Sequence, residues 1–138
     1  MLHRQALRGK RILVVEDEWA QAAVMRDMLE DAGAVVVGLA ADSRQACNLL
    51  DGTAADAAVV DLHLDGGTGH MLAHLLDMRG IPYLIATGYV PEATKAHPGV
   101  IVLPKPFRGE ELVWAVETLL DGRAQQWRVE AFSKNPEI

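Results

Sequence analysis

The chain alternates between short, continuous apolar runs and longer segments in which apolar residues recur every three or four positions. The continuous runs predict five β-strands, at residues 12–15, 34–38, 57–60, 81–86 and 100–103. The periodic segments predict four helices, over residues 19–32, from 43, from 68 and over 110–120. Residues 87–99, which contain two prolines and two glycines, predict a short or irregular helix.

Each predicted helix has an apolar face that we expect to pack inward. In the first helix this face is Ala22, Met25, Leu29 and Ala32, and in the last it is Leu112, Val116 and Leu119. The second helix, with Ser43 as its predicted N-cap, would bury Ala46, Leu49 and Leu50. The third, beginning near Thr68, would present Met71, Leu75 and Met78.

Five strands without internal alternation, each followed by a helix, indicate an α/β protein. Buried parallel strands have this composition because helices cover both faces of the sheet. We therefore expect a doubly wound, three-layer (βα)5 sandwich over residues 10–121. Residues 1–9 are expected to form a flexible leader and residues 122–138 a C-terminal tail.

Composition excludes several classes of function. The formal net charge is −6 and the sequence pI about 5.3, which argues against nucleic acid as a partner. No apolar stretch approaches the roughly 20 residues that a membrane span needs. The single cysteine, Cys47, allows no disulfide within the chain and is typical of a cytoplasmic protein.

Chemically distinctive residues follow four of the predicted strands. Glu16 and Asp17 follow the first strand, Asp61 the third, Thr87 the fourth and Lys105 the fifth. In an open parallel sheet, ligands bind beyond the carboxyl ends of the strands. We therefore expect these five residues to gather in one crevice.

The set predicts a magnesium-dependent phosphoryl site. Clustered carboxylates repel one another unless a cation offsets their charge, and carboxylate oxygens suit Mg²⁺. A lysine and a threonine hydroxyl can neutralise and hydrogen-bond a phosphoryl group. A carboxylate can itself accept a phosphoryl group as a nucleophile.

Four motifs, in this order, resemble the receiver domain of two-component response regulators over roughly residues 10 to 121. They are VVED at 14–17, VVDLHLDGGTG at 59–69, ATG at 86–88 and PKPF at 104–107. The resemblance implies a flavodoxin-like sheet with strand order 2-1-3-4-5. It also implies a cis bond between Lys105 and Pro106.

The resemblance assigns a role to each site residue. Asp61 would be the phosphoacceptor, and Thr87 and Lys105 would contact the phosphoryl group. Glu16, Asp17, Asp61 and the backbone carbonyl of His63 would hold Mg²⁺. Glu16 replaces the more usual Asp at the first acidic position.

Two departures from the family concern the conformational switch. Val102 occupies the position, three residues before Lys105, where receivers usually carry a Tyr or Phe. Tyr89, two residues after Thr87, is a candidate to replace that aromatic ring, with a half-exposed packing role as the alternative. The segment PYLIATGY also resembles an alphaproteobacterial subgroup of receivers with a Phe-Ala-Thr-Gly signature, although Ile85 replaces the Phe.

The functional prediction is a stand-alone response regulator that takes a phosphoryl group from a sensor histidine kinase. Phosphorylation would control its binding to a downstream protein or to a second copy of itself. It would catalyse its own phosphorylation and dephosphorylation without being an enzyme in the usual sense. Alternatives are a phosphate sink, a phosphorylation-independent binding module and, less favoured, an aspartyl-nucleophile phosphatase.

Three histidines are candidates for further roles, in control of dephosphorylation or in metal binding. His63 follows Asp61 by two residues, and its side chain could modulate loss of the phosphoryl group. His70 and His74 are four residues apart and could share a helix face. From sequence alone, such a pair is more typical of a solvated surface than of a transition-metal site.

Overall fold

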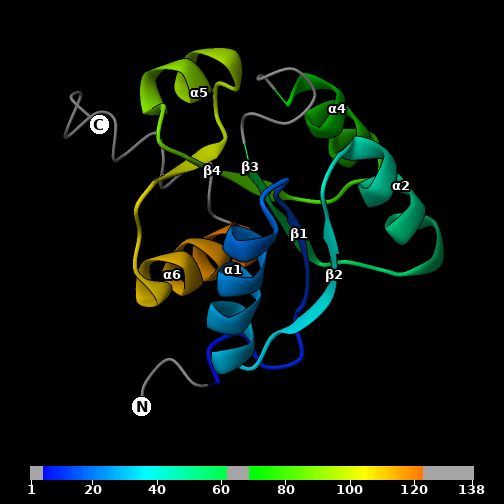
Figure 1. The fold of residues 1–138 in the computed structure, drawn as a ribbon, viewed down its shortest axis with the longest axis vertical. Coiled ribbons are helices and arrows are strands. Elements are labelled where there is room, and N and C mark those ends of the chain that lie inside the picture. The colour runs from blue at the N-terminus through cyan, green and yellow to red at the C-terminus, as the bar shows by residue number, and fades with distance from the viewer. Residues whose placement is uncertain (1–4, 62–68, 123–138) are drawn as a thin grey trace.

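The computed structural model describes residues 5–61 and 69–122, which form a five-stranded parallel sheet between two layers of helices (Figure 1). The strands are β1 (Arg11–Val15), β2 (Val35–Ala40), β3 (Ala57–Asp61), β4 (Tyr83–Thr87) and β5 (Ile101–Pro104). The helices are α1 (Trp19–Asp31), α2 (Ser43–Gly52), α4 (His70–Met78), α5 (Val90–Ala96) and α6 (Gly109–Leu120). The strand order is β2-β1-β3-β4-β5, so the predicted fold class and topology are confirmed.

The pleat of the strands divides the core into two clusters. Ile12 and Val14 of β1 face a cluster that includes buried residues of α1 and α6. Leu13 and Val15 face the opposite cluster, which includes buried residues of α2, α4 and α5. Figure 1 shows this division, with α1 and α6 on one side of the sheet and α2 and α4 on the other. Both faces are covered, which explains why the strands are continuously apolar.

Strand register brings the carboxyl ends of the strands to one edge of the sheet. Val15 pairs with Val60 and with Ala40, Asp61 pairs with Ala86, and Thr87 pairs with Pro104. The residues that follow β1, β3, β4 and β5 therefore lie at the same edge of the sheet. The observed strands β2, β4 and β5 lie one or two residues farther along the chain than the sequence predicted.

The predicted inward face of α4 is wrong in part, because Leu75 packs partly buried against the core but Met71 and Met78 do not. Leu72, Ala73 and Leu76 are buried, whereas Met71 is 68% exposed and Met78 is 74% exposed. Six of the nine residues in this helix are apolar, so the sequence pattern fits more than one inward face. Leu72 and Leu76 belong to the core cluster that includes Val60 of β3 and Ile85 of β4. Thr68, the predicted start of the helix, lies outside the described residues, and Gly69 is the N-cap.

The predicted N-cap of α2 is also wrong, by one residue. Asp42 is the N-cap, and its carboxylate accepts a hydrogen bond of 2.8 Å from the backbone N–H of Gln45. The Gln45 side chain in turn accepts one from the backbone N–H of Ala41. Ser43 is the first helical residue and is buried. Both residue types are good N-caps, and the reciprocal bonds of Gln45 select Asp42.

The fourth connection contains a helix of seven residues, α5, with Pro91 in its first turn. The prediction of a short fourth helix is therefore confirmed. The proline needs no hydrogen-bond partner for its nitrogen at this position.

The packed body extends toward the N-terminus beyond the boundary expected at residue 10. Leu7 is 1% exposed and belongs to the core cluster under α1 and α6. Its backbone N–H donates to the carbonyl of Ala32, and the N–H of Gly9 donates to that of Gly33. Within residues 5–61 and 69–122, the helices are too short or too polar to span a membrane.

Candidate functional site

Three carboxylates meet at the carboxyl ends of β1 and β3. Glu16, Asp17 and Asp61 each offer an oxygen within 4.8 Å of the others, and we call this group the acidic triad. Glu16 and Asp61 are buried, at 3% and 6% exposure, whereas Asp17 is exposed. The backbone N–H of Glu16 donates to the carbonyl of Ala40 at the end of β2, which fixes the chain where it leaves the sheet.

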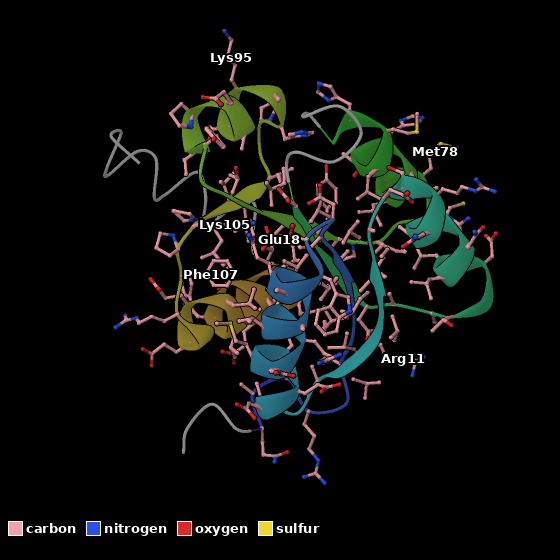
Figure 2. All side chains as sticks on the ribbon, viewed as in Figure 1. Arg11, Glu18, Met78, Lys95, Lys105 and Phe107 are labelled. Atoms are coloured by element: carbon pink, nitrogen blue, oxygen red, sulfur yellow. The ribbon has the colours of Figure 1, made fainter. Side chains whose placement is uncertain are left out.

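Lys105 brings a positive charge to the edge of the acidic triad. Its Nζ donates to Glu16 Oε1 at 2.9 Å and to Gln21 Oε1 at 2.8 Å. The Gln21 amide also donates to Glu18 Oε2 at 3.1 Å. Figure 2 shows Lys105 near the end of α1 that Glu18 precedes. The first turn of α1 therefore holds the lysine beside the acids.

The backbone around Lys105 links β5 to β4. The peptide bond between Lys105 and Pro106 is cis, as the resemblance implied. The backbone N–H of Lys105 donates to the carbonyl of Thr87 at 2.8 Å. The lysine side chain reaches across the sheet edge to Glu16.

Thr87 is the last residue of β4 and is 1% exposed. Its hydroxyl oxygen accepts a hydrogen bond of 3.0 Å from the backbone N–H of Tyr89. That bond uses an acceptor lone pair, so the hydroxyl proton remains available for a further acceptor. Asp61 pairs with Ala86, the residue before Thr87, so the two side chains lie on adjacent strands at the same edge.

Burial raises the pKa of Glu16 to about 7, and a hydrogen bond with the Asp61 side chain adds to the effect. The bond from Lys105 acts in the opposite direction but does not offset the desolvation. Two negative charges at this separation repel in a medium of low dielectric, which favours the protonated form of Glu16. A cation in place of that proton would satisfy the same charge balance.

The structure brings together most of the predicted site residues. Glu16, Asp17 and Asp61 cluster, Lys105 contacts Glu16, and Thr87 lies on the strand beside Asp61. His63, whose backbone carbonyl and side chain were both assigned roles, lies outside the described residues. The two candidate switch residues do not join the cluster.

Of those two residues, Val102 lies on β5 and pairs with Ile85 of β4, and Tyr89 follows the end of β4. Val102 is partly buried in the core cluster under α2, α4 and α5. Tyr89 is the N-cap of α5 and is 52% exposed. Its backbone contact with Thr87 connects it to the site, and its role in a switch stays a prediction.

Sequence reasoning missed Gln21. No motif marks it, because a single glutamine in the first turns of a helix ordinarily faces solvent. Its contact with Lys105 spans 84 positions in sequence and follows from how α1 packs beside the loop after β5. The start of α1, immediately after the acidic run, was the only available hint.

A family model and solved structures of similar fold agree on one family for this chain. The response regulator receiver domain model matches residues 12–117. A response regulator receiver protein from Sinorhizobium medicae WSM419 is 26% identical with a TM-score of 0.73, over 83% of this chain and 97% of that one. The chemotaxis response regulator CheY4 of Vibrio cholerae is 24% identical with a TM-score of 0.69, over 81% of this chain and 99% of that one.

The response regulator PhyR from Brucella abortus is 20% identical with a TM-score of 0.74. The match covers 98% of this chain but 56% of PhyR, so the chain spans about half the length of that protein. No curated protein sequence matches this chain.

Proposed function

Because this chain belongs to the response regulator receiver domain family, we propose that it is a response regulator that accepts a phosphoryl group on Asp61 from a sensor histidine kinase. The observation that carries the proposal is the convergence of the acidic triad with Lys105 at the sheet edge. Glu16 and Asp17 are adjacent, but Asp61 and Lys105 lie far from them and from each other in sequence. Folding alone brings them together, and the arrangement matches the needs of phosphoryl chemistry.

The donor set fits Mg²⁺. Three carboxylates supply hard oxygen ligands within 4.8 Å of one another, two of them are buried, and one is exposed toward solvent. Glu16, Asp17 and Asp61 would hold the ion, with the carbonyl of His63 as a further expected ligand. When bound, Mg²⁺ offsets the negative charge of the incoming phosphoryl group and of the acids around it.

Asp61 is the proposed nucleophile. One of its carboxylate oxygens forms a bond to phosphorus while the bond between phosphorus and the donor imidazole nitrogen breaks. The electron pair of that bond stays with the imidazole, which then takes a proton. Asp61 is 6% exposed at the end of β3, a position that limits the directions from which a donor or water can approach.

Thr87 and Lys105 would receive the phosphoryl oxygens. The Lys105 ammonium now donates to Glu16 and Gln21, and a phosphoryl group on Asp61 offers it a stronger acceptor. The Thr87 hydroxyl can donate its proton while its oxygen keeps the bond from Tyr89. Movement of Thr87 would therefore pull on the first turn of α5.

We infer that the signal leaves through the surface of α5 and β5. Tyr89 caps α5, is half exposed and contacts Thr87 through its backbone. A short helix with few buried residues can shift at low cost, which suits a switch. A downstream protein, or a second copy of this chain, would distinguish the two positions of this surface.

The test is phosphotransfer from a panel of purified, labelled histidine kinases. The expected result is Mg²⁺-dependent transfer from at least one kinase to the native chain and none to Asp61→Asn. The matched control is Asp56→Asn, which changes an exposed aspartate at the opposite end of β3. Labelling of Asp61→Asn equal to that of the native chain would overturn the assignment, and so would transfer that persists in excess chelator.

A further inference from the structure

A second cluster of ligating side chains lies away from the acidic triad, between α4 and the residues that follow α5. His70 and His74 of α4 line a pocket of about 470 Å³ together with His97, which follows α5. Asp77 lines the same pocket. None of the residues of the acidic triad contributes to it. The site proposed for phosphoryl transfer does not use any of these side chains.

The third histidine changes how the pair on α4 is interpreted. His97 is 7% exposed, so it is a buried imidazole and not a solvated surface group. Its backbone is fixed at the end of α5, where its N–H donates to the carbonyl of Ala93 and its carbonyl accepts from Val100. A buried imidazole on a fixed backbone therefore lines one pocket with the two exposed imidazoles of α4.

The distance between rings matches that of two ligands on one ion. The ring centroids of His70 and His97 are 5.0 Å apart, with the ring planes tilted by 47°. For metal–nitrogen bonds of about 2.0–2.1 Å and a tetrahedral angle, two imidazole centroids lie about 5 Å apart. The ring separation is therefore compatible with a shared coordination sphere once the ring nitrogens point toward one ion.

His74 can supply the third nitrogen. It lies four residues after His70, so the two side chains project from one face of α4. Within the described residues, the acidic triad is the group whose ligand atoms already converge. The imidazole nitrogens would converge after rotation of the side chains on α4, where both His70 and His74 are exposed and can change rotamer at low cost. Asp77, one turn later, brings a carboxylate that can orient the His74 ring or balance the charge of the ion.

We propose that His70, His74 and His97 form a binding site for a borderline divalent transition metal, with Zn²⁺ and Ni²⁺ as the favoured ions. Imidazole nitrogen selects this class of ion over Mg²⁺, whereas the oxygen ligands of the acidic triad do the reverse. The two sites on the chain therefore differ in ligand chemistry and do not compete for Mg²⁺.

Metal binding would have a structural consequence. An ion at this site joins α4 to the end of α5, two elements that are separated in sequence. The short helix α5 would then be held at both ends, by Tyr89 on Thr87 and by His97 on the ion. A bound ion would restrict the movement of α5 and protect this region from local unfolding.

The experiment is calorimetric titration of Zn²⁺ into the full chain carrying Asp61→Asn, which breaks the acidic triad. The expected result is one ion per chain with micromolar or tighter affinity. His74→Gln and His97→Gln, each added to this background, should weaken binding by at least about tenfold. Met71→Ala, an exposed neighbour of His70 outside the pocket, is the matched control and should leave the affinity unchanged.

Two further readouts separate the site from nonspecific binding. Co²⁺ bound to nitrogen ligands in a tetrahedral site should give intense visible absorption that His74→Gln and His97→Gln remove. Hydrogen exchange of α5 should slow when Zn²⁺ is added. Because His74 is exposed, loss of binding in His74→Gln cannot be ascribed to misfolding, and circular dichroism checks the fold of His97→Gln.

The proposal is overturned if His97→Gln binds Zn²⁺ as tightly as its parent, since the ions would then be held by the surface pair alone. It is also overturned if the parent binds no Zn²⁺ at these concentrations. Both outcomes are independent of whether Asp61 accepts a phosphoryl group.

Discussion

Binding of Mg²⁺ should release a proton from Glu16, and its affinity should therefore depend on pH. The pKa of Glu16 is raised to about 7 by burial and by the Asp61 side chain. In the metal-free protein this carboxyl group is protonated below that pH and ionised above it. A cation requires the ionised form, so protons compete with Mg²⁺ and its affinity must fall as the pH falls.

The size of the effect follows from that pKa. For one competing proton, the apparent dissociation constant is multiplied by 1 + 10^(pKa − pH). This factor is about 1.1 at pH 8 and about 11 at pH 6, so Mg²⁺ should bind about tenfold more weakly at the lower pH. The same relation predicts release of about half a proton per ion at pH 7 and about 0.9 at pH 6.

Isothermal titration calorimetry measures both quantities. Titrations of Mg²⁺ in buffers that differ in ionisation enthalpy give the number of protons released, and repetition across this pH range gives the affinity. Glu16→Gln should bind Mg²⁺ more weakly and lose most of the pH dependence. Glu30→Gln, which changes an exposed acid near the far end of α1, should retain it. An affinity that changes less than about twofold over this range in the native chain would refute the reasoning.

Three other substitutions test the fold and the site. Leu7→Ala should lower the free energy of unfolding by about 2–5 kcal/mol in urea titrations, because Leu7 is fully buried; a loss below about 0.5 kcal/mol would show that residues 5–9 do not belong to the packed body. Asp42→Ala should lower the free energy of unfolding by about 1 kcal/mol, because the α2 N-cap is lost; an unchanged free energy of unfolding would indicate that Ser43 is the N-cap. Lys105→Ala should slow phosphorylation at Asp61 by about a hundredfold or more in single-turnover assays, whereas Lys95→Ala, on the outer side of α5 in Figure 2, should react at the native rate. Equal rates for the two lysine variants would argue against the role of Lys105.

Much of the fold could be predicted because the strands are buried on both faces. Continuous apolar runs such as Leu13–Val15 and Ala57–Val60 lack the alternation of polar and apolar residues that is typical of a strand with one exposed face. The residues after these runs then had to lie at one sheet edge. The convergence of the acidic triad with Lys105 follows from that topology, without any knowledge of side-chain positions.

The features that sequence missed depend on packing between elements. In α4, methionine and leucine are equally apolar, and only contact with the sheet decides that Leu72 and Leu76 face inward. Leu7 lies in a segment whose basic residues suggest a solvated terminus, yet its backbone pairs with the end of α1. His97 approaches His70 across 27 positions, a contact that no local pattern encodes.

The most direct test of the central claim is to locate the phosphoryl group on the chain. The protein is phosphorylated by its kinase in the presence of Mg²⁺ and then treated with borohydride, which reduces an aspartyl phosphate to homoserine. Peptide mass spectrometry then identifies the modified position. The account predicts homoserine at residue 61 in the native chain and none in Asp61→Asn. Homoserine at another aspartate, or a label that survives as a phosphohistidine, would contradict it.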